Sequence, residues 1–195
     1  MNSKRPGGNL RFIVLVGILS ALVFALSSLS IPIPIPLGPV TRIHTGNLMC
    51  LLSGLLFGPW AGGLSAGIGS MLFDLSKPEY ASEFWITFFT KFCMGFAAGI
   101  CHYRLLLRFS DKIRLILSAL SGSLLYVVLY LAKTALHQHF INGVPWSAVW
   151  LILLTASSAS LINAAIAVTG SVLLYMPLRP ALAASFLLPT TKKPA

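Results

Sequence analysis

Long apolar runs, separated by short polar segments, follow one another along almost the whole chain. About 20 apolar residues are needed to cross a bilayer core of roughly 30 Å. The runs therefore predict membrane helices at residues 12–28, 47–57, 60–75, 84–102, 115–137 and 145–178. The expected fold class is an all-α integral membrane protein with six transmembrane helices.

The second and third runs are shorter than an ordinary crossing. They either span a locally thin part of the membrane or form a re-entrant pair buried in protein. The sixth run is long enough to tilt strongly or to project beyond the lipid. The whole arrangement forms a single transmembrane domain at residues 12–178.

Composition agrees with this pattern: 56% of the residues are hydrophobic, 9% are charged and the mean hydropathy is +0.86. These values exclude an ordinary soluble domain. The net charge of +10 does not indicate a nucleic-acid partner, because the basic residues stand mostly at the ends of apolar runs instead of clustering on a soluble face.

Basic residues predict the orientation, since Lys and Arg in short loops remain cytoplasmic. Ten of the fourteen Lys and Arg residues fall on one side if both termini are inside: Lys4, Arg5, Arg11, Arg104, Arg108, Lys112, Arg114, Arg179, Lys192 and Lys193. Residues 1–11 and 179–195 are then cytoplasmic tails of a plasma-membrane protein. The N-terminus also fits a secretory signal, whose cleavage would leave five spans.

Residues 41–75 contain seven glycines and a central Gly-Pro break, a pattern typical of two short helices packed through small residues. A hairpin would return Arg42, His44 and Asn47 to the same membrane surface as Asp74. These four polar residues are therefore candidates for the mouth of a solute site. The glycines themselves are expected to pack the hairpin.

The segment SIPIPIPLGPVTRIHTG at residues 30–46 has four prolines in eight residues, which excludes a helix and favours an extended chain. It is either a lid over the outer mouth or a plain interfacial connector. The connection at residues 137–145 is a second candidate gate.

Ionisable residues inside spans are costly, by about 2.5–3.5 kcal/mol on insertion scales, and they usually serve a function. Lys91 shares a helical face with Glu83 and Thr87, as candidates for substrate contact or for an internal Glu83–Lys91 network. Lys133 shares a face with Tyr126 and Tyr130, and its alternative role is to snorkel to the interface.

The sixth span adds Trp150 near its outer end and Asn163 deeper inside, where an amide needs a partner. The outer halves of the last three spans thus predict a site for a small polar molecule with a ring or an anionic group. In the first span Gly17, Ala21 and Ala25 form a small-residue ridge, suited to a partner helix or to internal packing.

Catalytic motifs are missing: the chain has no phosphate loop and no metalloprotease or hydrolase signature. Cys50, Cys93 and Cys101 lie within spans and are expected to be buried thiols. The sequence therefore predicts neither an enzyme nor a bound metal or cofactor.

Three segments together carry a family resemblance: the hairpin LLFGPWAGGLSAGIGSMLFDL, the following FWITFFTKFCMGFAAGI, and the C-terminal INAAIAVTGSVLLYMPLR. Over about residues 10–183 the chain resembles the substrate-binding S components of energy-coupling factor (ECF) vitamin transporters. The resemblance implies six helices with both termini cytoplasmic.

The resemblance also implies a mechanism. Such a subunit captures a micronutrient outside, then topples in the membrane while docked on a transmembrane coupling subunit that two ATPase subunits drive. In the family an AxxxA-type motif of the first helix contacts the coupling subunit, and Ala21 and Ala25 match it.

The substrate stays open at this stage among vitamins such as riboflavin, pantothenate or a folate-like compound. A Lys91 that faces the cavity favours a carboxylate or phosphate, whereas a Lys91 with an internal partner makes a neutral flavin equally suitable. Alternatives to the S component are a self-sufficient carrier or channel, and an intramembrane enzyme or assembly factor.

Overall fold

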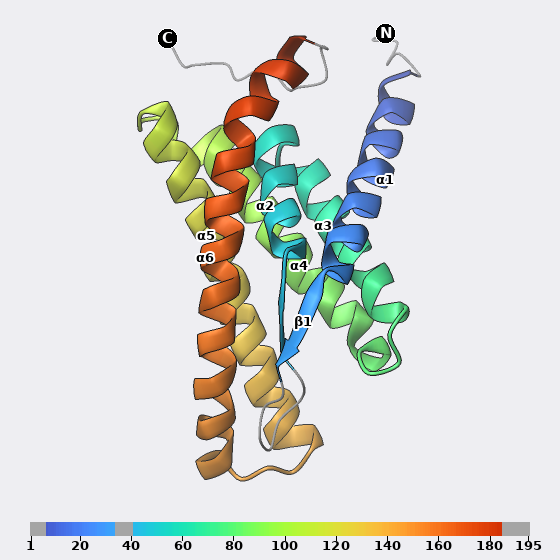
Figure 1. Ribbon diagram of the computed structural model, residues 1–195, viewed down its shortest axis with the longest axis vertical. Helices are drawn as coiled ribbons and strands as arrows, with labels where there is room; N and C mark the ends of the chain where they lie inside the picture. Colours follow the sequence, from blue (N-terminus) through green and yellow to red (C-terminus); the bar gives the residue numbers. More distant parts are fainter. Residues whose placement is uncertain (1–6, 34–40, 185–195) are drawn as a thin grey trace, which may run out of the picture.

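The computed structural model describes residues 7–33 and 41–184, and these residues form a helical bundle with one short β-hairpin (Figure 1). The helices are α1 (Gly7–Ser28), α2 (Gly46–Phe57), α3 (Pro59–Leu75), α4 (Phe84–Ile100), α5 (Asp111–Leu136) and α6 (Trp146–Ala184). A 3₁₀ turn η1 (Ala81–Glu83) precedes α4, and the π-helices η2 (Cys101–Leu105) and η3 (His137–Ile141) continue α4 and α5. The strands are β1 (Ser30–Ile33) and β2 (Thr41–His44).

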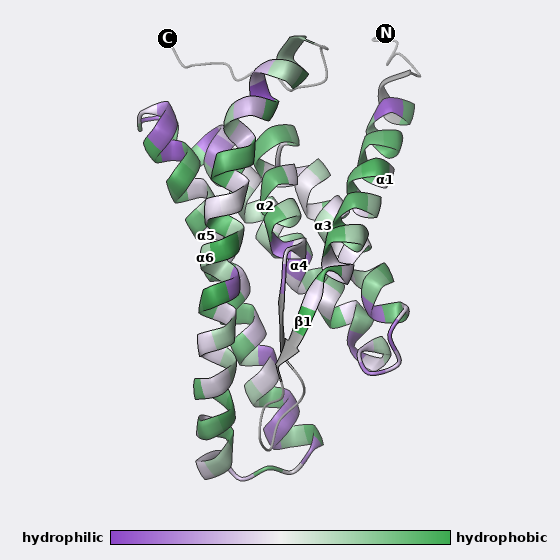
Figure 2. Ribbon diagram, viewed as in Figure 1, coloured by the Kyte–Doolittle hydropathy of each residue, from purple (hydrophilic) through white to green (hydrophobic). Residues whose placement is uncertain are grey.

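Four helical stretches among the described residues are long and apolar enough to cross a membrane: Leu10–Ser28, Ala81–Leu105, Asp111–Ile141 and Trp146–Ala184. Hydrophobic residues dominate the middle of the bundle, and hydrophilic ones gather toward the helix ends (Figure 2). The membrane class expected from the sequence is thus confirmed. Six crossings, cytoplasmic termini and a transmembrane domain bounded at 12–178 stay predictions, and residues 1–6 and 185–195 of the tails lie outside the described residues.

The helices α2 and α3 form the expected hairpin, which turns at Gly58 with φ of +89°. Almost every residue of α2 is buried, because the helix is enclosed by α1, α3, α4 and α6. A Cβ placed on Gly62 of α3 would lie 2.3 Å from the Cα of Gly54 in α2. A Cβ on Gly95 of α4 would lie 2.4 Å from the carbonyl oxygen of Gly62. The three backbones therefore approach more closely than any side chain permits.

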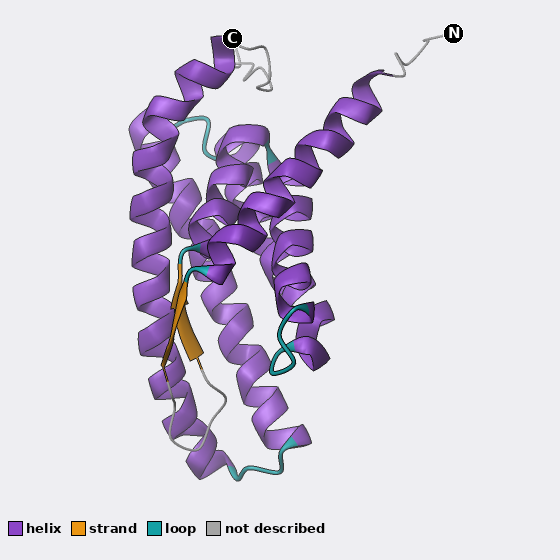
Figure 3. Ribbon diagram, turned by 45° about the vertical axis from the view of Figure 1, so that its right-hand side comes forward, coloured by secondary structure: helices purple, strands orange, loops and turns teal. Residues whose placement is uncertain are grey.

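The Pro-rich segment is extended where the structure describes it. β1 and β2 pair antiparallel, with Ser30 opposite His44 and Ile33 opposite Thr41. The hairpin lies along α6, and the two longest helices, α5 and α6, reach past the other helices at that end (Figures 1 and 3). Residues 34–40, the middle of the predicted lid, lie outside the described residues.

Three helix ends differ from the sequence prediction by four or more residues. α1 begins at Gly7, five residues before the expected start at residue 12. α5 begins at Asp111, four residues before the expected apolar run. Asp111 and Lys112 of this first turn are exposed, whereas Arg114 is buried. α6 continues to Ala184 through Pro177 and Pro180. The first turn of α1 and the last turn of α6 lie at the same end of the bundle (Figure 1), which agrees with an even number of crossings. All three cysteines are free thiols.

Replacing Gly95 with alanine should test the backbone contact. We expect Gly95→Ala to destabilise the protein by about 1–3 kcal/mol, since overpacking a close-packed core costs that much. The measurement is the thermal unfolding midpoint in detergent. Gly17→Ala is the matched control, because a Cβ on Gly17 meets nothing within 4 Å and both changes favour helix equally. Equal midpoints for the two variants would contradict the contact.

Candidate functional site

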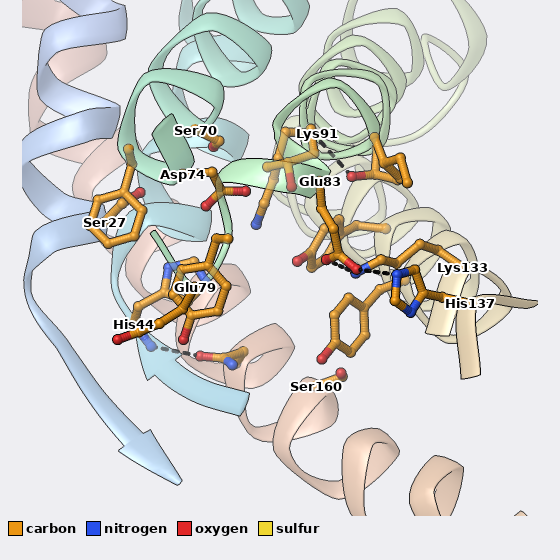
Figure 4. Close-up of a pocket in the computed structure, with 18 of the residues that line it drawn as sticks. Ser27, His44, Ser70, Asp74, Glu79, Glu83, Lys91, Lys133, His137 and Ser160 are labelled. Atoms are coloured by element: carbon orange, nitrogen blue, oxygen red, sulfur yellow. Dashed lines mark hydrogen bonds and ion pairs between the residues drawn. The ribbon is translucent and has the colours of Figure 1, made fainter. Parts of the chain in front are cut away.

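A polar cavity of about 330 Å³ lies between the β-hairpin, the turn from α3 to α4, and the middle of α5 and α6 (Figure 4). Nine of the residues predicted from the sequence line it: His44, Asp74, Glu83, Thr87, Lys91, Tyr126, Tyr130, Lys133 and Asn163. His44 and Asp74 come from opposite ends of the 41–75 block. The hairpin thus brings both ends to one surface, as the sequence indicates.

Three predicted residues do not line the cavity. Asn47 lies just behind it and is 1% exposed. Trp150 lies apart from it on the outer surface of α6, with 65% of its surface exposed. Arg42 belongs to β2, but its side chain lies outside the described part of the structure.

Lys91 is almost completely buried, at 4% exposure, and joins three helices. Its ammonium group donates a hydrogen bond to Oδ1 of Asn47 in α2. The same nitrogen lies 3.8 Å from the ring centroid of Tyr126 in α5, which is a favourable cation–π distance. A charged amine inside the bundle is therefore held by protein groups while it still borders the cavity.

Glu83 pairs with α5 and not with Lys91. Its carboxylate accepts a hydrogen bond from Lys133 and lies 3.3 Å from Nε2 of His137. Eight helical residues separate Glu83 from Lys91, a rise of about 12 Å, whereas α5 crosses next to Glu83. Thr90 does not bridge Glu83 and Lys91, since its hydroxyl donates to the backbone oxygen of Thr87. Figure 4 shows Glu83, Lys133 and His137 joined at one wall of the cavity.

Asn163 connects α6 to the β-hairpin. Its Oδ1 accepts a hydrogen bond of 2.9 Å from the backbone N–H of His44, the last residue of β2. The buried Asn163 amide oxygen thus has a hydrogen-bond partner, as a polar group inside the bundle requires. The bond also fixes the base of the hairpin against the cavity wall.

The predicted contacts left out part of the lining: Ser27, Ser70, Phe73, Glu79, Tyr80, Ser82, Ile86, Thr90 and Ser160. His137, which lies in the predicted gate at residues 137–145, also lines the cavity. One signal was available for Glu79. The whole chain has four acidic residues, and three of them fall within positions 74–83. This concentration of acidic residues is unusual in a strongly basic chain, and all three of them line the cavity.

An apolar groove between α1 and α3 is a second surface feature. It is lined by Phe12, Ile13, Val16, Gly17, Ser20, Ala21, Phe24, Leu64, Ile68 and Leu72. Gly17, Ala21 and Ala25 are all exposed, so the small-residue ridge does not pack against another helix within the described residues.

Comparison with known proteins identifies the class. A family model described as the S component of ECF-type riboflavin transporters matches residues 8–180. The chain belongs to this family. S components are membrane-embedded transporter subunits and not enzymes, so the expected membrane location and the absence of catalytic motifs both agree with the family.

Solved structures with the same fold include further S components. The S component of a bacterial ECF transporter is 20% identical, with a TM-score of 0.56, over 90% of this chain and 98% of the other. The S component for biotin from an ECF-type ABC transporter is 17% identical, with a TM-score of 0.58, over 93% and 95% of the two chains. At these identities the likeness shows the fold alone. No curated protein matches this S component in sequence.

Removing the amide that holds Lys91 should weaken the bundle. We expect Asn47→Leu to lower stability by about 1–3 kcal/mol, because a buried donor loses an acceptor. The measurement is the unfolding midpoint in detergent without ligand. Ser53→Ala is the control on the same helix, since that buried hydroxyl bonds only to the Met49 carbonyl of its own helix. An equal loss in both variants would contradict a special role for the Lys91–Asn47 bond.

Proposed function

We propose that this S component is the high-affinity capture subunit of an ECF-type importer for a water-soluble vitamin. The observation that carries the proposal is the polar, aromatic-walled cavity at one end of an apolar bundle. Its volume of about 330 Å³ lies within the range of small-molecule sites. Lys91, Lys133, Tyr126, Tyr130 and Asn163 are its proposed substrate contacts, with His44, Asp74, Glu83 and Thr87 around them.

The charges of the cavity favour a neutral ligand over an anion. Among the described residues, its lining holds three carboxylates (Asp74, Glu79, Glu83) and two ammonium groups (Lys91, Lys133). Both lysines already donate to protein oxygens. An anionic vitamin such as pantothenate or a folate-like compound would have to compete for these donors and face the excess carboxylate. A neutral flavin has neither cost.

The aromatic wall favours a flat ring. Tyr126 and Tyr130 stack on each other, with ring centroids 6.1 Å apart and an interplanar angle of 28°. Phe73 contributes a further ring from α3. Aromatic faces of this kind recognise heteroaromatic ligands by stacking, and the family description names riboflavin. We therefore infer riboflavin, or a close flavin, as the substrate.

Two segments are the proposed gates. The β-hairpin borders the cavity through His44, and the segment after α5 borders it through His137. The His44–Asn163 and Glu83–His137 contacts hold these segments near the closed position. Ligand entry would break one or both contacts.

Delivery of the vitamin by toppling of the whole subunit agrees with the close packing of α2, α3 and α4. The backbones of α2, α3 and α4 touch directly below the cavity, so these helices cannot separate cheaply to open a path through the bundle. The groove between α1 and α3, with Gly17, Ala21 and Ala25 beside it, is the proposed docking surface for the transmembrane coupling subunit, which two ATPase subunits would drive.

Riboflavin titration tests the substrate. The purified chain should quench riboflavin fluorescence on binding, and mass spectrometry of the small molecule that co-purifies should identify a flavin.

Lys91→Ala should weaken binding at least tenfold, about 1.4 kcal/mol, with unchanged expression. Lys77→Ala is the control, because Lys77 is exposed and does not line the cavity. Unchanged affinity in Lys91→Ala would reject the site, and binding of pantothenate or folate but not riboflavin would reject the flavin.

Bulky residues in the groove should separate docking from capture. Ala21→Trp and Ala25→Trp should abolish vitamin uptake in cells that hold the energising subunits, while riboflavin binding in detergent stays intact, because both residues are exposed and neither lines the cavity. Leu161→Trp, at an exposed position of α6 that does not line the groove, is the control. Uptake into liposomes by the chain alone, without ATP, would instead support a self-sufficient carrier.

A further inference from the structure

A second polar cluster lies far from the cavity, where α5 begins and α6 ends. We call it the α5-start cluster: His102 of η2, Arg114 and Ser118 of α5, and Tyr175 and Arg179 of α6. Arg114 precedes Tyr126 by twelve helical residues, a rise of about 18 Å. The cluster is therefore separate from the vitamin cavity. Hydrophilic residues are concentrated at this end of α5 (Figure 2).

Arg114 is the central residue of the cluster, and only 3% of its surface is exposed. Its Nη2 donates a hydrogen bond of 2.9 Å to Oδ1 of Asp111, one turn earlier. Its Nε has no partner among the described residues. A buried guanidinium with an unsatisfied donor is costly, so native structures usually supply a further acceptor.

His102 and Ser118 also leave polar atoms unsatisfied. His102 is 1% exposed, and its Nε2 shares a hydrogen bond of 2.9 Å with the Tyr175 hydroxyl. Its Nδ1 and the Ser118 hydroxyl have no partner within the described part of the chain. If the Tyr175 hydroxyl donates to Nε2, then Nδ1 carries the proton and is a second donor.

The charge of the cluster is positive. Arg179 lies over the Tyr175 ring, with its guanidinium carbon 5.6 Å from the centroid. Asp111 is the nearby carboxylate, and its side chain is 65% exposed. A rotation of Asp111 into solvent would therefore leave two guanidinium groups without a counter-charge. The sequence holds no other acidic residue outside positions 74–83.

We propose that the α5-start cluster binds a phosphate-type oxyanion, which replaces Asp111 at Arg114. Nε and Nη2 lie on the same edge of a guanidinium, so one phosphate group accepts from both in a bidentate pair. The Asp111 carboxylate uses only Nη2. Nδ1 of His102 and the Ser118 hydroxyl add neutral donors, and Arg179 adds charge.

Such an anion would join the ends of α4, α5 and α6, because the cluster draws on all three segments. Two sources supply the same chemistry: free phosphate or a phosphate ester in solution, and the headgroup of an anionic phospholipid. The experiment below separates these sources. It does not depend on the vitamin or on the proposed transport function.

Thermal unfolding in nanodiscs tests the proposal. The first arm titrates inorganic phosphate into the chain in phosphatidylcholine nanodiscs, with chloride balancing the ionic strength. The second arm replaces part of the phosphatidylcholine with phosphatidylglycerol. We expect a saturable rise of the unfolding midpoint in at least one arm. Response to phosphate identifies a soluble ligand, and response to phosphatidylglycerol alone identifies a lipid headgroup.

Three variants make the test specific. Arg114→Gln should weaken the response at least tenfold in apparent affinity. Asp111→Asn should strengthen it, because the competing carboxylate is gone, an outcome that a purely structural role for the Arg114–Asp111 pair does not produce. Lys112→Gln removes an exposed charge from the same turn and should leave the response unchanged.

Several results would overturn the proposal. One is the absence of any midpoint shift beyond that of chloride and phosphatidylcholine, which would indicate that only water fills the cluster. Another is an equal loss in Lys112→Gln and Arg114→Gln, which would indicate general surface attraction. If Arg114→Gln does not fold, the wild-type chain and Asp111→Asn decide: a tighter response in Asp111→Asn supports the site, and an unchanged or weaker one rejects it.

Discussion

Direct backbone contact between α2, α3 and α4 is the constraint on which the rest of the structure depends. Gly54, Gly62 and Gly95 let the three helices approach without side chains between them. Lys91 lies one turn before Gly95 on α4, and Asn47 lies two turns before Gly54 on α2. The glycine contact therefore fixes the register that places the Lys91 ammonium group against the Asn47 amide. Burying the Lys91 ammonium group would be costly in lipid, but it is tolerated here because the Asn47 amide is already in position to accept its hydrogen bond.

Both lysines of the cavity above this block are held by groups of the bundle itself. Lys91 is held by Asn47 and Tyr126, and Lys133 is held by Glu83 together with His137. Polar groups that are already paired within the protein orient a ligand more than they attract its charge. A ligand in such a site is recognised by shape, stacking and hydrogen bonds, which agrees with a neutral heteroaromatic vitamin more than with an anion.

The two ends of the molecule therefore have different electrostatic properties. Three of the four acidic residues surround the cavity, whereas the α5-start cluster holds Arg114 of α5 and Arg179 of α6 near the single carboxylate of Asp111. The positive-inside rule predicts that basic residues of short loops lie on the cytoplasmic side. It does not account for the burial of Arg114, which is 3% exposed and keeps an unsatisfied Nε.

The sequence by itself determined the membrane class, the approximate helix limits, the α2–α3 hairpin and nine of the cavity residues. These features follow from hydropathy, turn residues and helical periodicity, which are local properties of the chain. Only the tertiary structure decided which groups pair. Glu83 pairs with Lys133 of α5 and His137 of η3 and not with Lys91 on its own face, and Asn163 bonds to the backbone of His44, 119 positions away. Trp150 lies near the outer end of the sixth predicted span, where the sequence suggested a ligand contact, but its side chain is exposed on the outer surface of α6. The physical reason is that such contacts depend on how helices cross. Crossing is set by side-chain and backbone packing between segments remote in sequence, and the periodicity of a single helix does not encode it.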